Sequence, residues 1–385
     1  MKSLPELDLP DPPGHNLSLD WLRGMAAILV LVTHLRRDFF VAFPSDPAPH
    51  TVLNSALFFI TRLGPDAVMI FFVLSGYLVG GQAVMDARAG RFSLHRYMIA
   101  RATRLYTVLI PALLLTATLD MLGGNWASSF HRSQTLLANL LFLQDIFGHV
   151  YGSNGPLWSL AFEWWFYVLF GLSVFVYGHR RIALRSFDVG LAGLLLLVLL
   201  VIFRSLIPLF LVWLGGVAIR TIRAPPARIR WPLVLLSVAL LCILMLASTR
   251  DWFTLVSMRR CRLPIDYLVG AGAALLIWLL RNADPIRASW FAAGTTLASF
   301  SFTLYAIHQP LTALMVHLLV PHLLTHAGFA EWAALLIFAA GIVPCAFGWY
   351  WLFERNTPRI RRWLLAKLEP QGSMQTIGQA QSLRR

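Results

Sequence analysis

The chain has 385 residues, of which 58% are hydrophobic and only 13% are charged, and its formal net charge is +14. A soluble globular domain carries about 25% charged residues, so this composition excludes a soluble enzyme, a disordered chain and a coiled coil. The apolar runs are continuous rather than alternating, which argues against a membrane β-barrel. We therefore predict an all-α polytopic membrane protein whose surplus of Arg reports on its orientation in the lipid bilayer rather than on nucleic-acid binding.

The N-terminal 18 residues are Pro-rich and mildly acidic and lack the basic start of a signal peptide, so we expect a cytoplasmic tail. A span needs roughly 20 mostly apolar residues, and ten runs qualify. These are 19–36, 66–82, 105–122, 158–178, 187–204, 206–220, 231–248, 264–280, 297–320 and 331–353. The segments 51–63 and 136–147 are shorter, and we expect them to lie at the outer interface or to re-enter the membrane.

The distribution of charge between the loops tests this topology. With the N-terminus inside, most of the 32 Lys and Arg residues fall on the inner side, and the main exception is an outer cluster around Arg259. The positive-inside rule then places both termini in the cytoplasm. The expected organisation is a tail of residues 1–18, a transmembrane domain of residues 19–363 and a C-terminal tail of residues 364–385.

Polar residues within the apolar runs are the candidates for chemistry, because ionisable groups in a membrane are costly and mark sites or pathways. In the first run, Arg23 and His34 are eleven residues apart, which places them about 20° from a common helix face. Imidazole exchanges protons near neutral pH, so His34 is a candidate general base. The alternative is a structural, hydrogen-bonded histidine at a helix end.

Three further motifs follow along the chain. Arg101 and Arg104 share a face where an inner loop becomes a helix, an arrangement suited to phosphates; the alternative is ordinary topological charge. Ser159, Glu163 and Tyr167 form a polar stripe on an aromatic helix, for which an inter-helix salt bridge is the alternative. The last polar stripe consists of Ser301, Tyr305, His308 and Thr312; the alternative explanation for it is hydrogen bonding between helices.

Taken in order, the motifs resemble the membrane-bound acyltransferase 3 family over about residues 18–363. The matching segments are LDWLRG with the following His34, FFVLSGYL, the Arg101-x-x-Arg104 pair, GPLWSLAFEWWFY and SFTLYAIHQP. Two departures concern the first and fourth motifs: Trp21 stands where Gly is usual, and Trp164 and Trp165 stand where Glu-Gln often follows the acid. The SGNH domain fused to some relatives is not expected here.

The resemblance implies an O-acyltransferase of the bacterial inner membrane. It would move an acyl group, commonly acetyl, from cytoplasmic acyl-CoA to a hydroxyl of an extracytoplasmic or lipid-linked carbohydrate, without a metal. Its protein partners would be separate envelope-biosynthesis proteins. The residues implied are His34, Glu163 and His308 for catalysis, Arg23, Arg101 and Arg104 for the donor, and Ser159, Ser301 and Tyr305 for orientation.

Placement along the spans suggests a mechanism. The phosphates of CoA would stay at the inner face on Arg101 and Arg104, the acceptor would enter from outside near Glu163, and His34 would act as general base or become acylated itself. A transporter or flippase for a lipid-linked glycan would also explain the buried His and Glu, but it does not need the phosphate site. A non-catalytic scaffold leaves the polar stripes unexplained.

Overall fold

The computed structural model describes residues 16–40, 51–124, 131–179, 186–202, 204–223, 227–248, 254–258, 260–281, 290–323 and 328–368. The predicted tails, apart from their innermost residues, and Arg259 lie outside these ranges. The helices are α1 (Leu17–Phe39), α2 (Val52–Ile60), α3 (Gly64–Ser75), α4 (Gly81–Arg88), α5 (Leu94–Leu122), α6 (Ser133–Leu140), α7 (Trp158–His179), α8 (Ser186–Ile202), α9 (Ile207–Thr221), α10 (Ala227–Ser248), α11 (Ile265–Leu280), α12 (Trp290–Leu323), α13 (Phe329–Leu352) and α14 (Thr357–Leu368). The strands are β1 (Thr254–Met258) and β2 (Cys261–Pro264).

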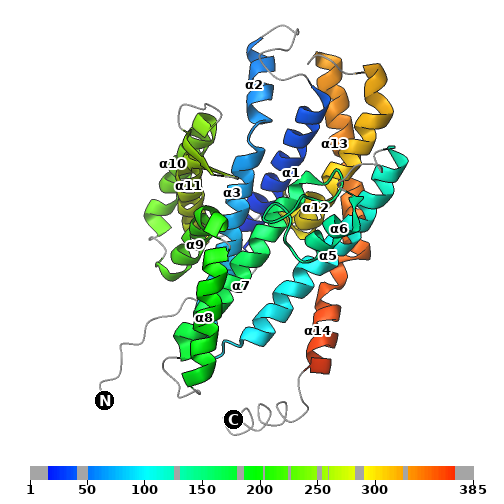
Figure 1. The fold of residues 1–385 in the computed structure, drawn as a ribbon. Helices are drawn as coiled ribbons and strands as arrows, with labels where there is room; N and C mark the ends of the chain where they lie inside the picture. Colours follow the sequence, from blue (N-terminus) through cyan, green and yellow to red (C-terminus); the bar gives the residue numbers. More distant parts are fainter. Residues whose placement is uncertain are drawn as a thin grey trace.

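Three helices, α1, α3 and α12, form the centre of the bundle (Figure 1). Helix α1 packs along both α3 and α12, helices α9 and α11 lie against α3, and α5 lies against α12 and α7. Asn16 fixes the start of α1: its side chain accepts a hydrogen bond from the backbone N–H of Leu19 (3.1 Å) and donates to the carbonyls of Leu280 (3.1 Å) and Arg281 (2.7 Å). The first turn of α1 is therefore tied to the end of α11.

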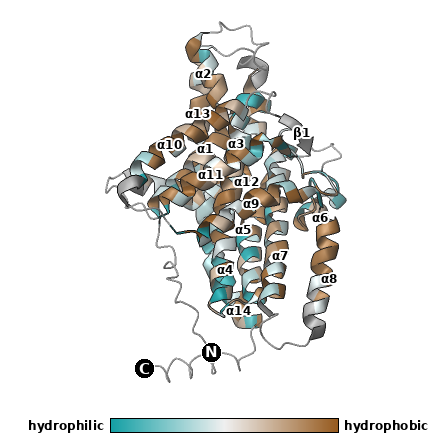
Figure 2. Cartoon of the chain, turned by 90° about the vertical axis from the view of Figure 1, so that its left-hand side faces the viewer, coloured by the Kyte–Doolittle hydropathy of each residue, from teal (hydrophilic) through white to brown (hydrophobic). Residues whose placement is uncertain are grey.

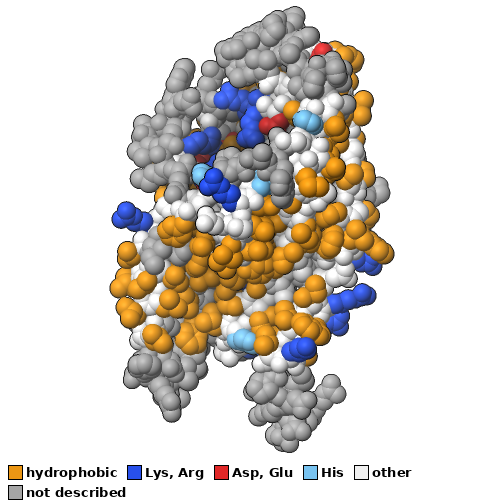
Figure 3. Space-filling view, turned by 45° about the vertical axis from the view of Figure 1, so that its right-hand side comes forward, with side chains coloured by type: hydrophobic (Ala, Val, Ile, Leu, Met, Phe, Trp, Pro, Cys, Tyr) orange, Lys and Arg blue, Asp and Glu red, His pale blue; other side chains and the backbone are white. Residues whose placement is uncertain are grey.

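The surface of the bundle is that of a multi-pass integral membrane protein. Seven helical stretches among the described residues are long and apolar enough to cross a bilayer, and α11 is a shorter apolar helix of 16 residues. Apolar side chains form a broad belt around the middle of the molecule, with Lys and Arg above and below it (Figure 3), and hydropathy falls toward α4 and α14 (Figure 2). Each of the ten predicted runs lies on a helix, while the number of crossings and the side of the termini stay predictions.

The fold is all-α as predicted, and the short hairpin of β1 and β2 is a small addition that the apolar runs do not predict. Its strands pair antiparallel between α10 and α11. Arg262 of β2 pairs with the buried carboxylates of Asp66 (3.1 Å) and Asp266 (2.7 Å), and Arg260 pairs with Asp145 (2.9 Å). Two arginines of the predicted outer cluster thus have acidic partners, which balance part of its positive charge.

A π-helical turn, Gly76–Gly80, interrupts the second predicted span. At Gly76 a side-chain carbon would collide with the backbone carbonyl of Trp213, and at Gly216 one would collide with the carbonyl of Val73. Helices α3 and α9 therefore approach backbone to backbone, a contact that small residues allow between membrane helices. The π turn lies directly after Ser75, and such turns occur frequently at functional sites.

The segment between α6 and α7, residues 141–157, enters the bundle as irregular backbone. Gln144, Asn154 and Leu157 are fully buried in it. The amide of Gln144 donates to the carbonyl of Leu157 (3.0 Å), and the amide of Asn154 donates to the carbonyl of Ala306 in α12 (2.8 Å). Irregular backbone is tolerated within a membrane protein when protein groups satisfy it in this way, and α7 consequently begins inside the protein.

Candidate active site

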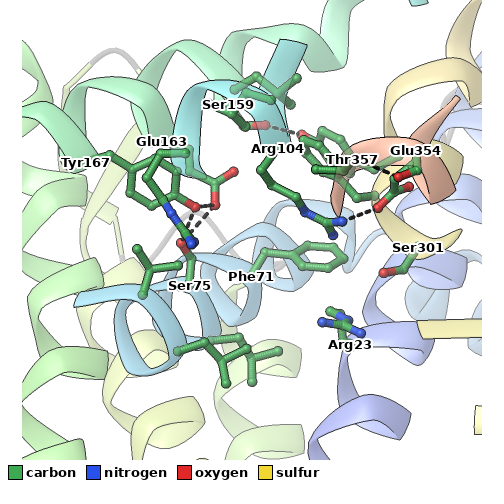
Figure 4. Close-up of a pocket in the computed structure, with 18 of the residues that line it drawn as sticks. Arg23, Phe71, Ser75, Arg104, Ser159, Glu163, Tyr167, Ser301, Glu354 and Thr357 are labelled. Atoms are coloured by element: carbon green, nitrogen blue, oxygen red, sulfur yellow. Dashed lines mark hydrogen bonds and ion pairs between the residues drawn. The ribbon is translucent and has the colours of Figure 1, made fainter. Parts of the chain in front are cut away.

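A cavity of about 560 Å³ lies between α1, α3, α5, α7, α12 and the start of α14. Figure 4 shows Ser75, Glu163 and Tyr167 on one side of it and Arg104, Glu354 and Thr357 on the other. Seven of the nine predicted site residues line this cavity, namely Arg23, Arg101, Arg104, Ser159, Glu163, Ser301 and Tyr305. His34 and His308 do not line it and form a pair of their own.

Glu163 is held by hydroxyl groups from two helices. Its Oε1 accepts hydrogen bonds from Ser75 Oγ (2.8 Å) and from the hydroxyl of Tyr167, and the indole N–H of Trp213 donates to Ser75 Oγ (3.1 Å). No ion pair joins Glu163 to a described residue. Among the described residues, Glu163 therefore does not form the inter-helix salt bridge that was the alternative. Its carboxylate lies at the cavity wall with one oxygen fixed by hydrogen bonds.

Arg104 is already paired, and its partner was missed in the sequence. Its guanidinium lies 2.5 Å from Glu354 Oε1, and the other oxygen of that buried carboxylate accepts from the backbone N–H (3.2 Å) and hydroxyl (2.5 Å) of Thr303. Glu354 directly follows the predicted span that ends at residue 353, so the sequence predicts an ordinary charged residue of a loop. A single acid directly after a long aromatic run was the available signal.

Arg101 differs from Arg104 although both belong to one motif. Its guanidinium lies over the ring of Tyr167, 5.9 Å from the ring centroid, and its buried Nε has no hydrogen-bond partner among the described residues. Arg23 reaches the cavity from α1 and pairs with Asp20 (3.2 Å). Of the two RxxR cations, Arg101 is thus the one open to an anionic ligand without displacing an acid.

Two of the three predicted orienting residues, Ser159 and Tyr305, are hydrogen-bonded to each other. Ser159 Oγ donates to the hydroxyl of Tyr305 (2.7 Å), which donates to the carbonyl of Pro156 (3.1 Å). Ser301 Oγ donates to the carbonyl of Ala298 within α12 (2.8 Å). Ser159 and Tyr305 therefore lock α7 to α12 beside the cavity.

The two histidines meet between α1 and α12, with ring centroids 5.0 Å apart. His308 is fully buried, and its Nδ1 lies 2.8 Å from the carbonyl of Tyr305 and 3.1 Å from that of Leu304. Because a carbonyl only accepts, Nδ1 carries the hydrogen, and the buried Nε2, which has no partner in the described part of the chain, holds a lone pair. His34 has the opposite assignment, since Arg37 donates to its Nδ1 (3.0 Å).

The structure corrects the expected depth of Glu163. We predicted it near the outer surface, away from the phosphate site, yet it lines the same cavity as Arg101 and Arg104. The reason is that α7 starts inside the bundle after the buried segment 141–157, whereas α5 starts at Leu94, ahead of the predicted run. Tyr305 lines this cavity, and its ring centroid is 5.9 Å from that of His308.

Within the described ranges, no group of three or more His, Cys, Asp or Glu side chains could hold a metal ion. The groups at hand are guanidinium, carboxylate, hydroxyl and imidazole. They can bind an anion, orient a carbonyl and exchange a proton.

Comparison with known proteins gives a family match and two partial relatives. A family model described as an acyltransferase domain matches residues 16–354. An O-acetyl transferase of Shigella phage Sf6 is 31% identical over 165 residues, which cover 40% of this chain and 45% of the relative. The acyltransferase MdmB of Streptomyces mycarofaciens is 30% identical over 161 residues, covering 40% of this chain and 38% of the relative. The aligned part thus spans less than half of each relative, and no solved structure matches.

Proposed function

Because the chain belongs to this acyltransferase family, we propose that it transfers an acyl group, in the first instance acetyl, from acyl-CoA to a hydroxyl of a carbohydrate. The donor would enter from the cytoplasmic face, and the acceptor would be an extracytoplasmic or membrane-linked glycan. The relative from phage Sf6 is named as an O-acetyl transferase, which supports the acetyl group and the oxygen acceptor. A bacterial inner membrane with both termini in the cytoplasm is the location that fits this reaction.

The observation that carries the proposal is a cationic cavity whose lining includes Tyr305, the neighbour of the imidazole pair. Arg101 supplies a guanidinium without an acidic partner among the described residues, and Arg23 stands across the same cavity. A diphosphate bound near Arg101 would let the pantetheine arm extend past Tyr305, whose ring lies beside His308. Arg104 lines this cavity too, but phosphates would compete for it with Glu354.

We assign the proton transfer to His34, supported by His308. As the hydroxyl oxygen of the acceptor attacks the thioester carbonyl, its proton passes to His34, the carbon–sulfur bond breaks, and the thiolate of CoA takes a proton back from the imidazolium. The Nδ1 of His34 must first be released by Arg37. The lone pair on His308 Nε2 offers the second N–H of the imidazolium an acceptor, an arrangement that keeps a catalytic histidine oriented.

The proposed site is completed by four polar residues, namely Glu163, Ser159, Tyr305 and Ser301. One oxygen of Glu163 is fixed by Ser75 and Tyr167, and its other oxygen could accept a hydrogen bond from the donor or the acceptor. The hydroxyl pair of Ser159 and Tyr305 lies between this carboxylate and His308. To orient the thioester carbonyl, the hydroxyl of Tyr305 would turn away from the carbonyl of Pro156, to which it donates in this structure.

The decisive experiment is acyl transfer by purified protein in nanodiscs, with labelled acetyl-CoA and a panel of glycan acceptors. We expect saturable binding of acetyl-CoA and label on the acceptor in the wild type. His34→Gln should bind acetyl-CoA but transfer no label. A wild-type protein that moves glycans across vesicles but does not bind acetyl-CoA would be a transporter and would refute the proposal.

A further inference from the structure

A second cavity of about 270 Å³ adjoins the first at the turn between α4 and α5. Both cavities are lined by Leu78, Val79, Ala100 and Arg101. Together they fall within the range of about 300–1,000 Å³ typical of small-molecule sites. A ligand longer than the first cavity can therefore extend into the second past Arg101.

One face of α5 joins the two compartments. Tyr97, Arg101 and Arg104 lie at i, i+4 and i+7, hence on one side of the helix. Tyr97 faces the second cavity, Arg101 lines both, and Arg104 lines the first. At 1.5 Å per residue this stripe is about 10 Å long, so the ligand would lie along the helix with Arg101 at its midpoint.

The second cavity combines positive charge with an aromatic wall. Arg91 and Arg96 line it together with Arg101, against a single acid, Asp86. Asp86 accepts from Gln82 (3.1 Å) and is 3.7 Å from Arg91, a pair whose arginine is 71% exposed. Exposed pairs contribute little, so this acid does not cancel the surplus of positive charge.

The aromatic wall consists of Phe92 and Tyr97, whose ring centroids are 5.6 Å apart. Aromatic side chains provide stacking surfaces for nucleobases, worth about 1–3 kcal/mol per base in proteins that bind single strands. Guanidinium groups suit phosphates because their donors match phosphate oxygens. Stacking rings beside a cluster of arginines therefore fit a nucleotide that carries more than one phosphate.

We propose that the second cavity binds the nucleotide end of the donor, an adenosine with a 3′-phosphate and a 5′-diphosphate. Arg91 and Arg96 hold its phosphates, Phe92 stacks on the base, and Arg101 takes the diphosphate at the junction. The inference rests on the proposed function and narrows it: the RxxR pair is divided, with Arg101 as ligand and Arg104 as the structural partner of Glu354. Donor specificity then resides in the turn between α4 and α5.

The test compares donors that share the thioester but differ in the nucleotide. KM and kcat are measured for acetyl-CoA and for acetyl-pantetheine in the wild type, in Arg91→Ala/Arg96→Ala and in Phe92→Ala. We expect Arg91→Ala/Arg96→Ala to raise the KM for acetyl-CoA about tenfold or more, the lower end for contacts to a charged group. Phe92→Ala should raise it about fivefold or more, the lower end for a stacked base. The kcat for acetyl-CoA and both constants for acetyl-pantetheine should stay as in the wild type.

The matched control is Arg88→Ala. Arg88 is a cation at the end of α4, next to the same turn, but it does not line the cavity. Three results would each overturn the nucleotide site. They are an equal rise in KM for both donors in the variants, a rise in the KM for acetyl-CoA in Arg88→Ala as large as in the variants, and equal KM values for the two donors in the wild type. Calorimetry with 3′,5′-ADP separates this inference from the function. Binding of 3′,5′-ADP that is lost in Arg91→Ala/Arg96→Ala supports the site even if no acyl transfer occurs; no binding by the wild type overturns it.

Discussion

The ion pair between Arg104 and Glu354 should be a main determinant of stability, and Glu354→Gln tests this. Removing one member of a buried ion pair costs about 3–5 kcal/mol. Two features reduce that figure here: the Arg104 side chain is 38% exposed, so water compensates part of its charge, and Gln can still accept the bonds from Thr303. We therefore expect a loss of about 2 kcal/mol in the free energy of unfolding.

A double-mutant cycle separates the pair from general damage to the cavity. Arg104→Met should cost about 3 kcal/mol, since it leaves a nearly fully buried carboxylate unpaired. The double variant should cost less than the sum by about 1.5–3 kcal/mol, within the range for groups in direct contact. The measurement is reversible unfolding in mixed micelles. Arg101→Met is the matched control, with a coupling to Glu354→Gln below about 0.5 kcal/mol, and an additive result for Arg104 would refute the reasoning.

Three further variants test other parts of the site. His34→Gln should lower kcat by about 10²–10⁴, the usual contribution of a general base, with binding of acetyl-CoA intact by calorimetry; activity above a few per cent of wild type would contradict the assignment. Glu163→Gln should lower kcat at least about tenfold without weakening the binding of acetyl-CoA, because the lost charge is negative and Arg101 stays in place. A raised KM for acetyl-CoA with an unchanged kcat would contradict this role of Glu163. Gly76→Ala should destabilise the protein by more than about 2 kcal/mol through its collision with the Trp213 carbonyl, which a thermal-shift assay would detect; an unchanged midpoint would show that α9 can move away.

Much of the helical fold follows from the sequence, because hydrophobic length alone marks a membrane span. The hairpin does not follow, since five residues of β1 bounded by two apolar helices give too short a pattern to distinguish from a loop. Glu163 illustrates a different limit. Its stripe with Ser159 and Tyr167 is local and could be predicted, whereas its depth depends on the buried segment 141–157, which is fixed by contacts to α12.

The same limit applies to the candidate site: features within one helix can be predicted from the sequence, and contacts between helices cannot. The face shared by Tyr97, Arg101 and Arg104 is a property of one helix and can be read from spacing. The meeting of His34 with His308, and of Arg104 with Glu354, joins residues hundreds of positions apart. No periodicity within one helix specifies which residues of two helices lie at the same level, so these pairs become visible only in the assembled bundle.

The buried segment ahead of α7 has a consequence for biosynthesis. The amide of Asn154 is satisfied by the carbonyl of Ala306, 152 residues later in the chain. At about 5–20 residues per second, a ribosome needs on the order of ten to thirty seconds to produce that partner. During this interval one hydrogen of the Asn154 side-chain amide lacks its final acceptor, so the segment must wait in a hydrated position while α8 to α11 are inserted. The cavity can therefore close only when α12 arrives, and a chain that ends before α12 would present quality-control proteases with an unassembled polar loop.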